Sequence, residues 1–179
     1  GEIIQLTNIN ATDFSEEVYF DVIRKKTAAL FSSASEAGVI SVKSSNEMIE
    51  KAALFGELIG IAFQIKDDIF DYYSSEELGK PTGNDMREGK LTLPALYVLN
   101  TLKDESMIDL ALKIRRLEAT DEEIAHFIEF IKQNGGIDYA SQVMVDYRNK
   151  ALDVLPESIS VELKTALTFF IDYVIERKK

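Results

Sequence analysis

The chain has 179 residues, of which 46% are hydrophobic and 28% are charged, a composition typical of one globular domain with a sizeable core. Its 31 acidic residues outnumber its 20 Lys and Arg residues, and the resulting net charge of −11 argues against a nucleic-acid partner. The lack of cysteine excludes disulfides and thiolate metal sites, and it fits a cytoplasmic location. The longest apolar run is too short for a transmembrane segment.

The first predicted helix begins near Ser15 and ends near Gly38. Tyr19, Ile23 and Leu30 fall on one face of it, and Lys26 falls on the same face. An ammonium group on an apolar face is costly unless an anion binds it, so Lys26 is a candidate anion ligand. The alternative is a lysine whose stem covers apolar surface while its charge stays in water.

A second, central helix is predicted over residues 47–73, because Ser44 and Glu47 match the capping-box pattern S-x-x-E. Glu57 is the only charged residue in the segment 52–65, so this helix should be buried among other helices. Two glycines four residues apart, Gly56 and Gly60, would let a neighbouring helix approach closely.

One polar face interrupts the central helix near its end. It carries Gln64, Asp67, Asp68 and Asp71, at positions i, i+3, i+4 and i+7. Carboxylates crowded on a buried helix repel one another, and desolvation raises the cost of their charge, so a positive partner is required. A fully solvated acidic face is the alternative.

The glycine-rich segment 74–91 reads as a loop and offers the cations Lys80, Arg87 and Lys90. Magnesium is commonly held by one or two carboxylates, by water and by the phosphate oxygens of a substrate. The acids and the lysines together therefore predict a Mg²⁺-diphosphate site.

The remainder of the chain reads as further helices. Thr92 should cap one of them, with Pro94 in its first turn, and Thr120 with Glu123 forms a second capping box. Other helices are predicted over residues 106–117, 137–155 and 161–177. No segment shows sustained strand alternation, so the predicted fold class is all-α.

Three consecutive blocks resemble the second aspartate-rich (DDxxD) region of the trans-prenyl diphosphate synthases. They read FQIKDDIFDY at residues 63–72, LGKPTGND at residues 78–85 and EGKLTLP at residues 88–94, in the order and at the spacing of that family. Lys26, Thr27 and Ala28 match a further block of the family, K-T-A, whose Lys and Thr face the allylic diphosphate. The resemblance covers essentially the whole chain, as the C-terminal half or so of a family member.

The fold implied by this resemblance is an isoprenoid-synthase-type helical bundle around a central buried helix, in a single domain over residues 1–179. The chemistry implied is prenyl transfer, in which an allylic diphosphate condenses with isopentenyl diphosphate through Mg²⁺-assisted ionisation. Intact members of the family are commonly homodimers. The resemblance carries over the following roles: Asp67, Asp68 and Asp71 for metal, with Asp85 as a weaker candidate; Lys26, Lys80 and Lys90 for diphosphate; and Lys26, Thr27 and Gln64 as catalytic residues.

The family's first aspartate-rich motif and its isopentenyl diphosphate block are absent from the sequence. We therefore expect the chain to be a fragment without its N-terminal helices, inactive by itself and prone to associate through uncovered apolar surface. Two alternatives remain: a terpene cyclase, which ionises the same substrates without chain extension, and a non-catalytic partner subunit of a hetero-oligomeric synthase. The K-T-A block and the two glycine-containing blocks favour the prenyl synthase over the cyclase.

Overall fold

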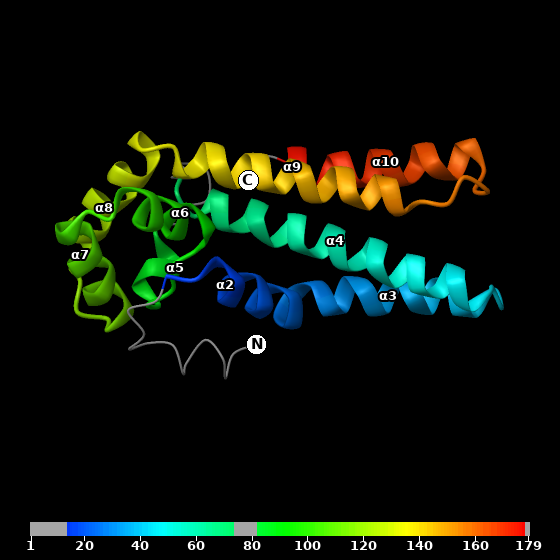
Figure 1. Cartoon of the computed structure of the whole chain (residues 1–179), viewed down its shortest axis with the longest axis horizontal. Coiled ribbons are helices and arrows are strands. Elements are labelled where there is room, and N and C mark those ends of the chain that lie inside the picture. Colours follow the sequence, from blue (N-terminus) through cyan, green and yellow to red (C-terminus); the bar gives the residue numbers. More distant parts are fainter. Residues whose placement is uncertain (1–13, 74–81, 178–179) are drawn as a thin grey trace. The chain divides into compact units, whose positions relative to one another are not determined.

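A computed structural model describes residues 14–73 and 82–177, and every regular element in these ranges is a helix (Figure 1). The all-α prediction is therefore confirmed. The chain divides into two compact units. Within the described ranges, unit 1 comprises residues 23–66 and 142–177, and unit 2 comprises residues 14–22, 67–73 and 82–141. The expectation of a single domain stays a prediction.

Unit 1 is built from long helices. They are the π-helix η1 (Arg24–Ala28), α3 (Ala29–Ser41), most of α4 (Asn46–Phe70), the later part of α9 (Gly136–Val154) and α10 (Val161–Glu176). In Figure 1, α3 runs alongside α4, and α9 runs alongside α10. The Arg148 guanidinium on α9 donates to the Asp172 carboxylate on α10 at 2.7 Å, which ties the second pair together.

The predicted burial of the central helix is largely confirmed. The apolar residues of α4 from Phe55 to Ile65 are buried or nearly so, whereas Leu54 is 45% exposed. A Cβ atom on Gly56 would lie 2.4 Å from the carbonyl oxygen of Phe31, and one on Gly60 would lie 2.6 Å from the Cα atom of Ala28. The two glycines therefore permit the close approach of α4 to η1 and α3 that their spacing predicted.

The helix that contains Lys26 differs from the prediction. It is interrupted by the π-helical turn Arg24–Ala28, in which i→i+5 bonding places an extra residue in the turn and rotates the residues after it. Tyr19 and Ile23 are buried as expected, but Lys26 is exposed and Leu30 is 73% exposed. The prediction of Lys26 on a buried apolar face is therefore wrong, because the residue that turns inward is Ala28.

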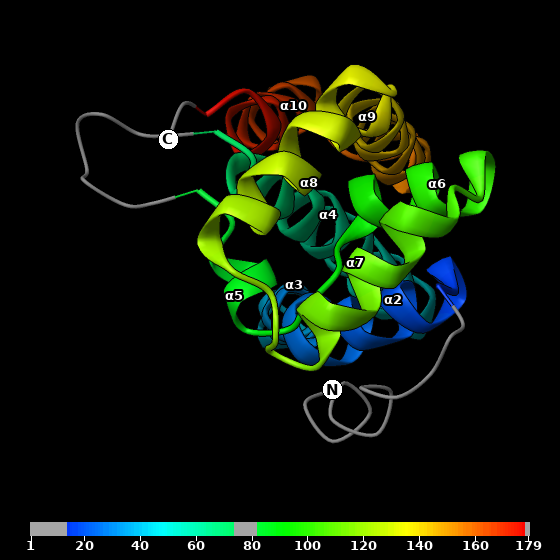
Figure 2. The same cartoon turned by 90° about the vertical axis from the view of Figure 1, so that its left-hand side faces the viewer.

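Unit 2 consists of shorter helices: most of α2 (Glu16–Ile23), α5 (Asn84–Arg87), α6 (Leu93–Leu102), α7 (Glu105–Arg115) and α8 (Asp121–Gln133). Figure 2 shows α6, α7 and α8 grouped together, and α8 packs against both α6 and α7. Leu93, Ile114, Phe127 and Ile131 are fully buried and form the core of this unit.

Several helix starts follow the sequence closely. Thr120 accepts a hydrogen bond from the amide of Glu123, and the Glu123 carboxylate accepts one from the amide of Thr120, so the capping box is confirmed. Thr92 occupies the N-cap position of α6, with Pro94 in the first turn, but its side chain makes no capping hydrogen bond. For α4 the cap is Ser45 and not Ser44, since the Ser45 hydroxyl accepts from the amide of Met48 at 3.3 Å.

Within residues 14–73 and 82–177, no helix combines the length and the apolar character needed to cross a membrane.

Replacing Gly60 with Ala should lower the free energy of unfolding by about 1–3 kcal/mol, because the new methyl group would press on the backbone of Ala28. Gly38→Ala is the matched control. Its Cβ meets nothing within 4 Å, so it should raise the stability by about 0.5–1 kcal/mol through helix propensity. Urea unfolding of both variants tests this, and equal effects of the two substitutions would contradict the packing described.

Two helices of unit 1 also expose large apolar side chains to solvent. Leu30 and Ile40 on α3 are 73% and 50% exposed, and Phe169 and Tyr173 on α10 are 74% and 65% exposed. The uncovered apolar surface expected from the sequence is thus found on α3 and α10. The chain should associate through these faces, and Phe169→Glu together with Leu30→Glu should weaken the association. Sedimentation at micromolar concentration measures it, and a compact monomer of the unsubstituted chain would contradict it.

Candidate functional site

The acidic end of α4 lies in unit 2. Phe70 is the last α-helical residue, and the amides of Asp71, Tyr72 and Tyr73 then donate to carbonyls three residues earlier, which tightens the chain into a final turn. Asp68 is buried, at 3% exposure, while Asp67 and Asp71 are half-buried. The three carboxylates therefore have distinct surroundings, although their spacing makes them look equivalent.

Asp68 is bonded to a residue that the sequence did not indicate. The Tyr19 hydroxyl on α2 donates to Oδ2 of Asp68 at 2.6 Å, and both side chains are buried. Burial raises the pKa of the Tyr19 hydroxyl well above its usual value, and the negative charge of Asp68 raises it further, so Tyr19 stays protonated as a donor. The sequence showed Tyr19 only as part of an apolar face.

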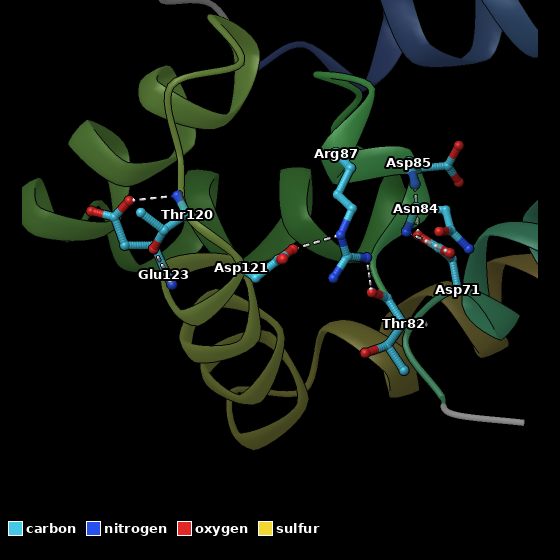
Figure 3. A network of polar contacts seen from close by, with 8 residues as sticks. All are labelled: Asp71, Thr82, Asn84, Asp85, Arg87, Thr120, Asp121 and Glu123. Carbon is cyan, nitrogen blue, oxygen red and sulfur yellow. Dashed lines mark hydrogen bonds and ion pairs between the residues drawn. The ribbon is translucent and has the colours of Figure 1, made fainter. Parts of the chain in front are cut away.

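Asp71 binds the backbone of the glycine-rich loop (Figure 3). Its Oδ1 accepts from the amide of Asn84, and its Oδ2 accepts from the amide of Asp85, each at 3.0 Å. The carbonyl oxygen of Asp71 also accepts from the amide of Gly83 at 2.8 Å. The start of α5 is therefore fixed to the turn that ends α4.

Asp85 and Lys90, two of the predicted site residues, lie near each other. The amide of Lys90 donates to the carbonyl oxygen of Asp85 at 2.8 Å, and Nζ of Lys90 lies 3.9 Å from Oδ1 of Asp85. Burial lowers the pKa of Lys90, but a hydrogen bond to Glu88 and the charges of Asp85, Glu88 and Asp68 outweigh it, so the pKa is raised. Lys90 is therefore a stable cation beside the acidic end of α4. Lys80, the other lysine predicted in this loop, lies outside the described residues.

The sequence suggested that Arg87 would meet the carboxylates of α4, but its hydrogen-bond partners lie elsewhere in unit 2. Its Nε donates to the Asp121 carboxylate on α8 at 2.7 Å, and its NH1 group donates to the carbonyl oxygen of Thr82 (Figure 3). Arg87 thus anchors α5 to the first turn of α8.

Unit 1 brings together two of the predicted catalytic residues. The Thr27 hydroxyl in η1 donates to Oε1 of Gln64 on α4 at 2.6 Å. One residue earlier on α4, the ring of Phe63 lies against Phe31 at 5.2 Å between ring centroids and beneath the Arg177 guanidinium at 4.0 Å. Lys26 precedes Thr27 and is exposed.

Whether this site suits a metal ion depends on the side-chain oxygens that could act as ligands. No group of three or more His, Cys, Asp or Glu side chains in the described ranges is arranged to hold a metal ion. Carboxylate oxygens are nevertheless the hard ligands that Mg²⁺ prefers, and it binds through only one or two of them when substrate phosphates and water supply the rest. A carboxylate also keeps lone pairs after accepting one hydrogen bond on each oxygen. The donor chemistry of Asp67 and Asp68 therefore fits Mg²⁺.

Comparison with solved structures gives close matches. The geranylgeranyl pyrophosphate synthase of Bacteroides thetaiotaomicron is 52% identical, with a TM-score of 0.92 over 98% of this chain and 58% of that one. A polyprenyl synthase of Caulobacter crescentus CB15, complexed with calcium and isoprenyl diphosphate, is 33% identical, with a TM-score of 0.89 over 99% of this chain and 55% of that one.

Sequence comparison agrees with the structural matches. A short chain isoprenyl diphosphate synthase of Methanothermobacter thermautotrophicus is 38% identical over 99% of this chain and 54% of its own length. The chain thus spans about half the length of the curated relative it matches. The sequence model of the polyprenyl synthetase family matches residues 1–131, and with these identities it establishes that the chain belongs to the polyprenyl synthetase family.

Proposed function

We propose that this chain carries the Mg²⁺- and diphosphate-binding part of a trans-prenyl diphosphate synthase, which condenses an allylic diphosphate with isopentenyl diphosphate. The observation that carries the proposal is the acidic end of α4, where Asp68 is held by Tyr19 and the loop bearing Asp85 and Lys90 is bound to Asp71. Membership of the polyprenyl synthetase family supports it.

In this proposal the carboxylates of Asp67 and Asp68 hold Mg²⁺, with Asp71 as the third acid of the motif and Asp85 beside them. Bound Mg²⁺ supplies positive charge to the diphosphate leaving group. The ammonium groups of Lys26, Lys80 and Lys90 bind the diphosphate oxygens and stabilise the negative charge that grows as the allylic C–O bond breaks. Cations that are held in place before a reaction stabilise such charge best, because they need no reorganisation during it.

The oxygens of Thr27 and Gln64 are proposed to face the allylic cation. The Thr27 hydroxyl gives its proton to Oε1 of Gln64, so the Thr27 oxygen can turn its lone pairs, and not its proton, toward a positive charge. The double bond of isopentenyl diphosphate attacks this cation and forms the new carbon–carbon bond, and a proton is then lost. The reaction needs apolar walls that keep water from the cation.

In the complete synthase that carries this chain, Asp67→Ala and Lys26→Ala should each reduce turnover by about 10²–10³, the usual cost of losing one electrostatic contact to a transition state. Lys25→Ala is the matched control, because Lys25 is an exposed neighbour of Lys26 outside the K-T-A block, and it should retain the rate. Steady-state assays with an allylic diphosphate and isopentenyl diphosphate measure the effect. Unchanged rates in the Asp67 and Lys26 variants would sink the proposal.

A further inference from the structure

Asp71 carries out a task in unit 2 that its place in the motif does not suggest. Three consecutive amides of the loop converge on it: Asn84 and Asp85 donate to its two carboxylate oxygens at 3.0 Å, and Gly83 donates to its carbonyl oxygen at 2.8 Å (Figure 3). Both side-chain oxygens of Asp71 are therefore engaged by the chain's own backbone.

The reason lies in the start of α5. The first amides of a helix have no partner within the helix, and a side chain at the N-cap position commonly accepts from them. The N-cap residue of α5 is Gly83, at a φ of +78°, and a Cβ atom there would lie 2.9 Å from side-chain atoms of Ile124 and Ile128. A capping side chain at residue 83 would therefore be strained, and Asp71 supplies the acceptors from another part of the chain.

The same contacts locate the backbone of Lys90, whose ammonium group is itself bonded to Glu88. Asp85 receives the amide of Lys90 on its carbonyl oxygen at 2.8 Å, and its Oδ1 lies 3.9 Å from Nζ of Lys90. Because Asp71 fixes the backbone of Asp85, it also fixes the base from which Lys90 extends. At the opposite end of α5, Arg87 is bound to Asp121, so the short helix is anchored at both ends.

We propose that Asp71 is a positioning residue, whose carboxylate orders the loop 82–90 without metal and thereby holds Lys90 for a diphosphate ligand. The diphosphate part rests on the proposed function, whereas the ordering of the loop rests on the hydrogen bonds alone. The motif treats Asp67, Asp68 and Asp71 alike, but the geometry separates them. Hydrogen bonds to an ionised carboxylate are roughly twice as strong as neutral ones, so two of them make the loop the principal partner of Asp71.

Amide hydrogen exchange of the chain, with a chelator present to remove divalent metal, tests the ordering of the loop. In Asp71→Ala the amides of Asn84 and Asp85 should exchange about ten- to a hundredfold faster, as expected for the loss of one charge-assisted bond at each. Amides of α8 should keep their protection, which reports that unit 2 remains folded. If Asp71→Ala disrupts unit 2 as a whole, Asp71→Asn decides, since it keeps the side-chain volume and one acceptor and should release one amide of the pair.

Asp67→Asn is the matched control. It removes a charge from the same end of α4, but the amides of Asn84 and Asp85 donate to Asp71 and not to Asp67. It should leave exchange at Asn84 and Asp85 unchanged. Unaltered protection of both amides in the Asp71 variants would overturn the proposal, and so would equal loss of protection in Asp67→Asn.

Calorimetric titration with Mg²⁺ and inorganic pyrophosphate tests the link to Lys90. Asp71→Asn should bind more weakly than the unsubstituted chain, and Asp71→Glu, which keeps both carboxylate oxygens, should recover part of the affinity. Unchanged affinity in Asp71→Asn, despite faster exchange of the loop amides, would overturn the role in ligand binding. Failure of the unsubstituted chain to bind Mg²⁺-pyrophosphate would instead contradict the proposed function, and the exchange result would still decide what Asp71 does.

Discussion

The need of the carboxylates at the end of α4 for hydrogen-bond donors is the constraint on which the arrangement around them in unit 2 depends. Asp68 is nearly fully buried, and a buried carboxylate is tolerated only where donors compensate its lost hydration. The donor comes from Tyr19, 49 residues earlier in the chain. Asp71 is held in the same way by amides 13 and 14 residues later. The acids therefore have a structural role, since they fix the positions of α2 and α5 at the end of α4. This role is separate from the binding of a ligand.

Local sequence patterns predicted the helices well, because caps and apolar periodicity act over a few residues. The capping box at Thr120 and the proline in the first turn of α6 are found as expected. Close helix packing at Gly60 also follows from composition, since a Cβ atom there would overlap Ala28. The π-helical turn Arg24–Ala28 had no such signal, and it rotates the residues after it, so the expected burial of Lys26 was wrong.

The candidate site was harder to derive, since its contacts join distant segments. The i, i+3, i+4 and i+7 spacing correctly grouped the polar residues of α4, but it could not distinguish a carboxylate bonded to a buried tyrosine from one bonded to loop amides. Tyr19 was missed because an aromatic residue on an apolar face has the same pattern whether or not its hydroxyl meets an acid. The resemblance to prenyl synthases identified the family, while the division of labour among Asp67, Asp68 and Asp71 emerges only from their partners.

The central claim is that the acidic end of α4 binds a divalent cation together with a diphosphate. Mn²⁺ is a paramagnetic substitute for Mg²⁺, so nuclear magnetic resonance of the labelled chain with Mn²⁺ and pyrophosphate locates the ion directly. The account predicts that signals of residues 64–71 broaden first and that Asp67→Asn abolishes this broadening. Broadening centred elsewhere, or an unchanged response in Asp67→Asn, would contradict it.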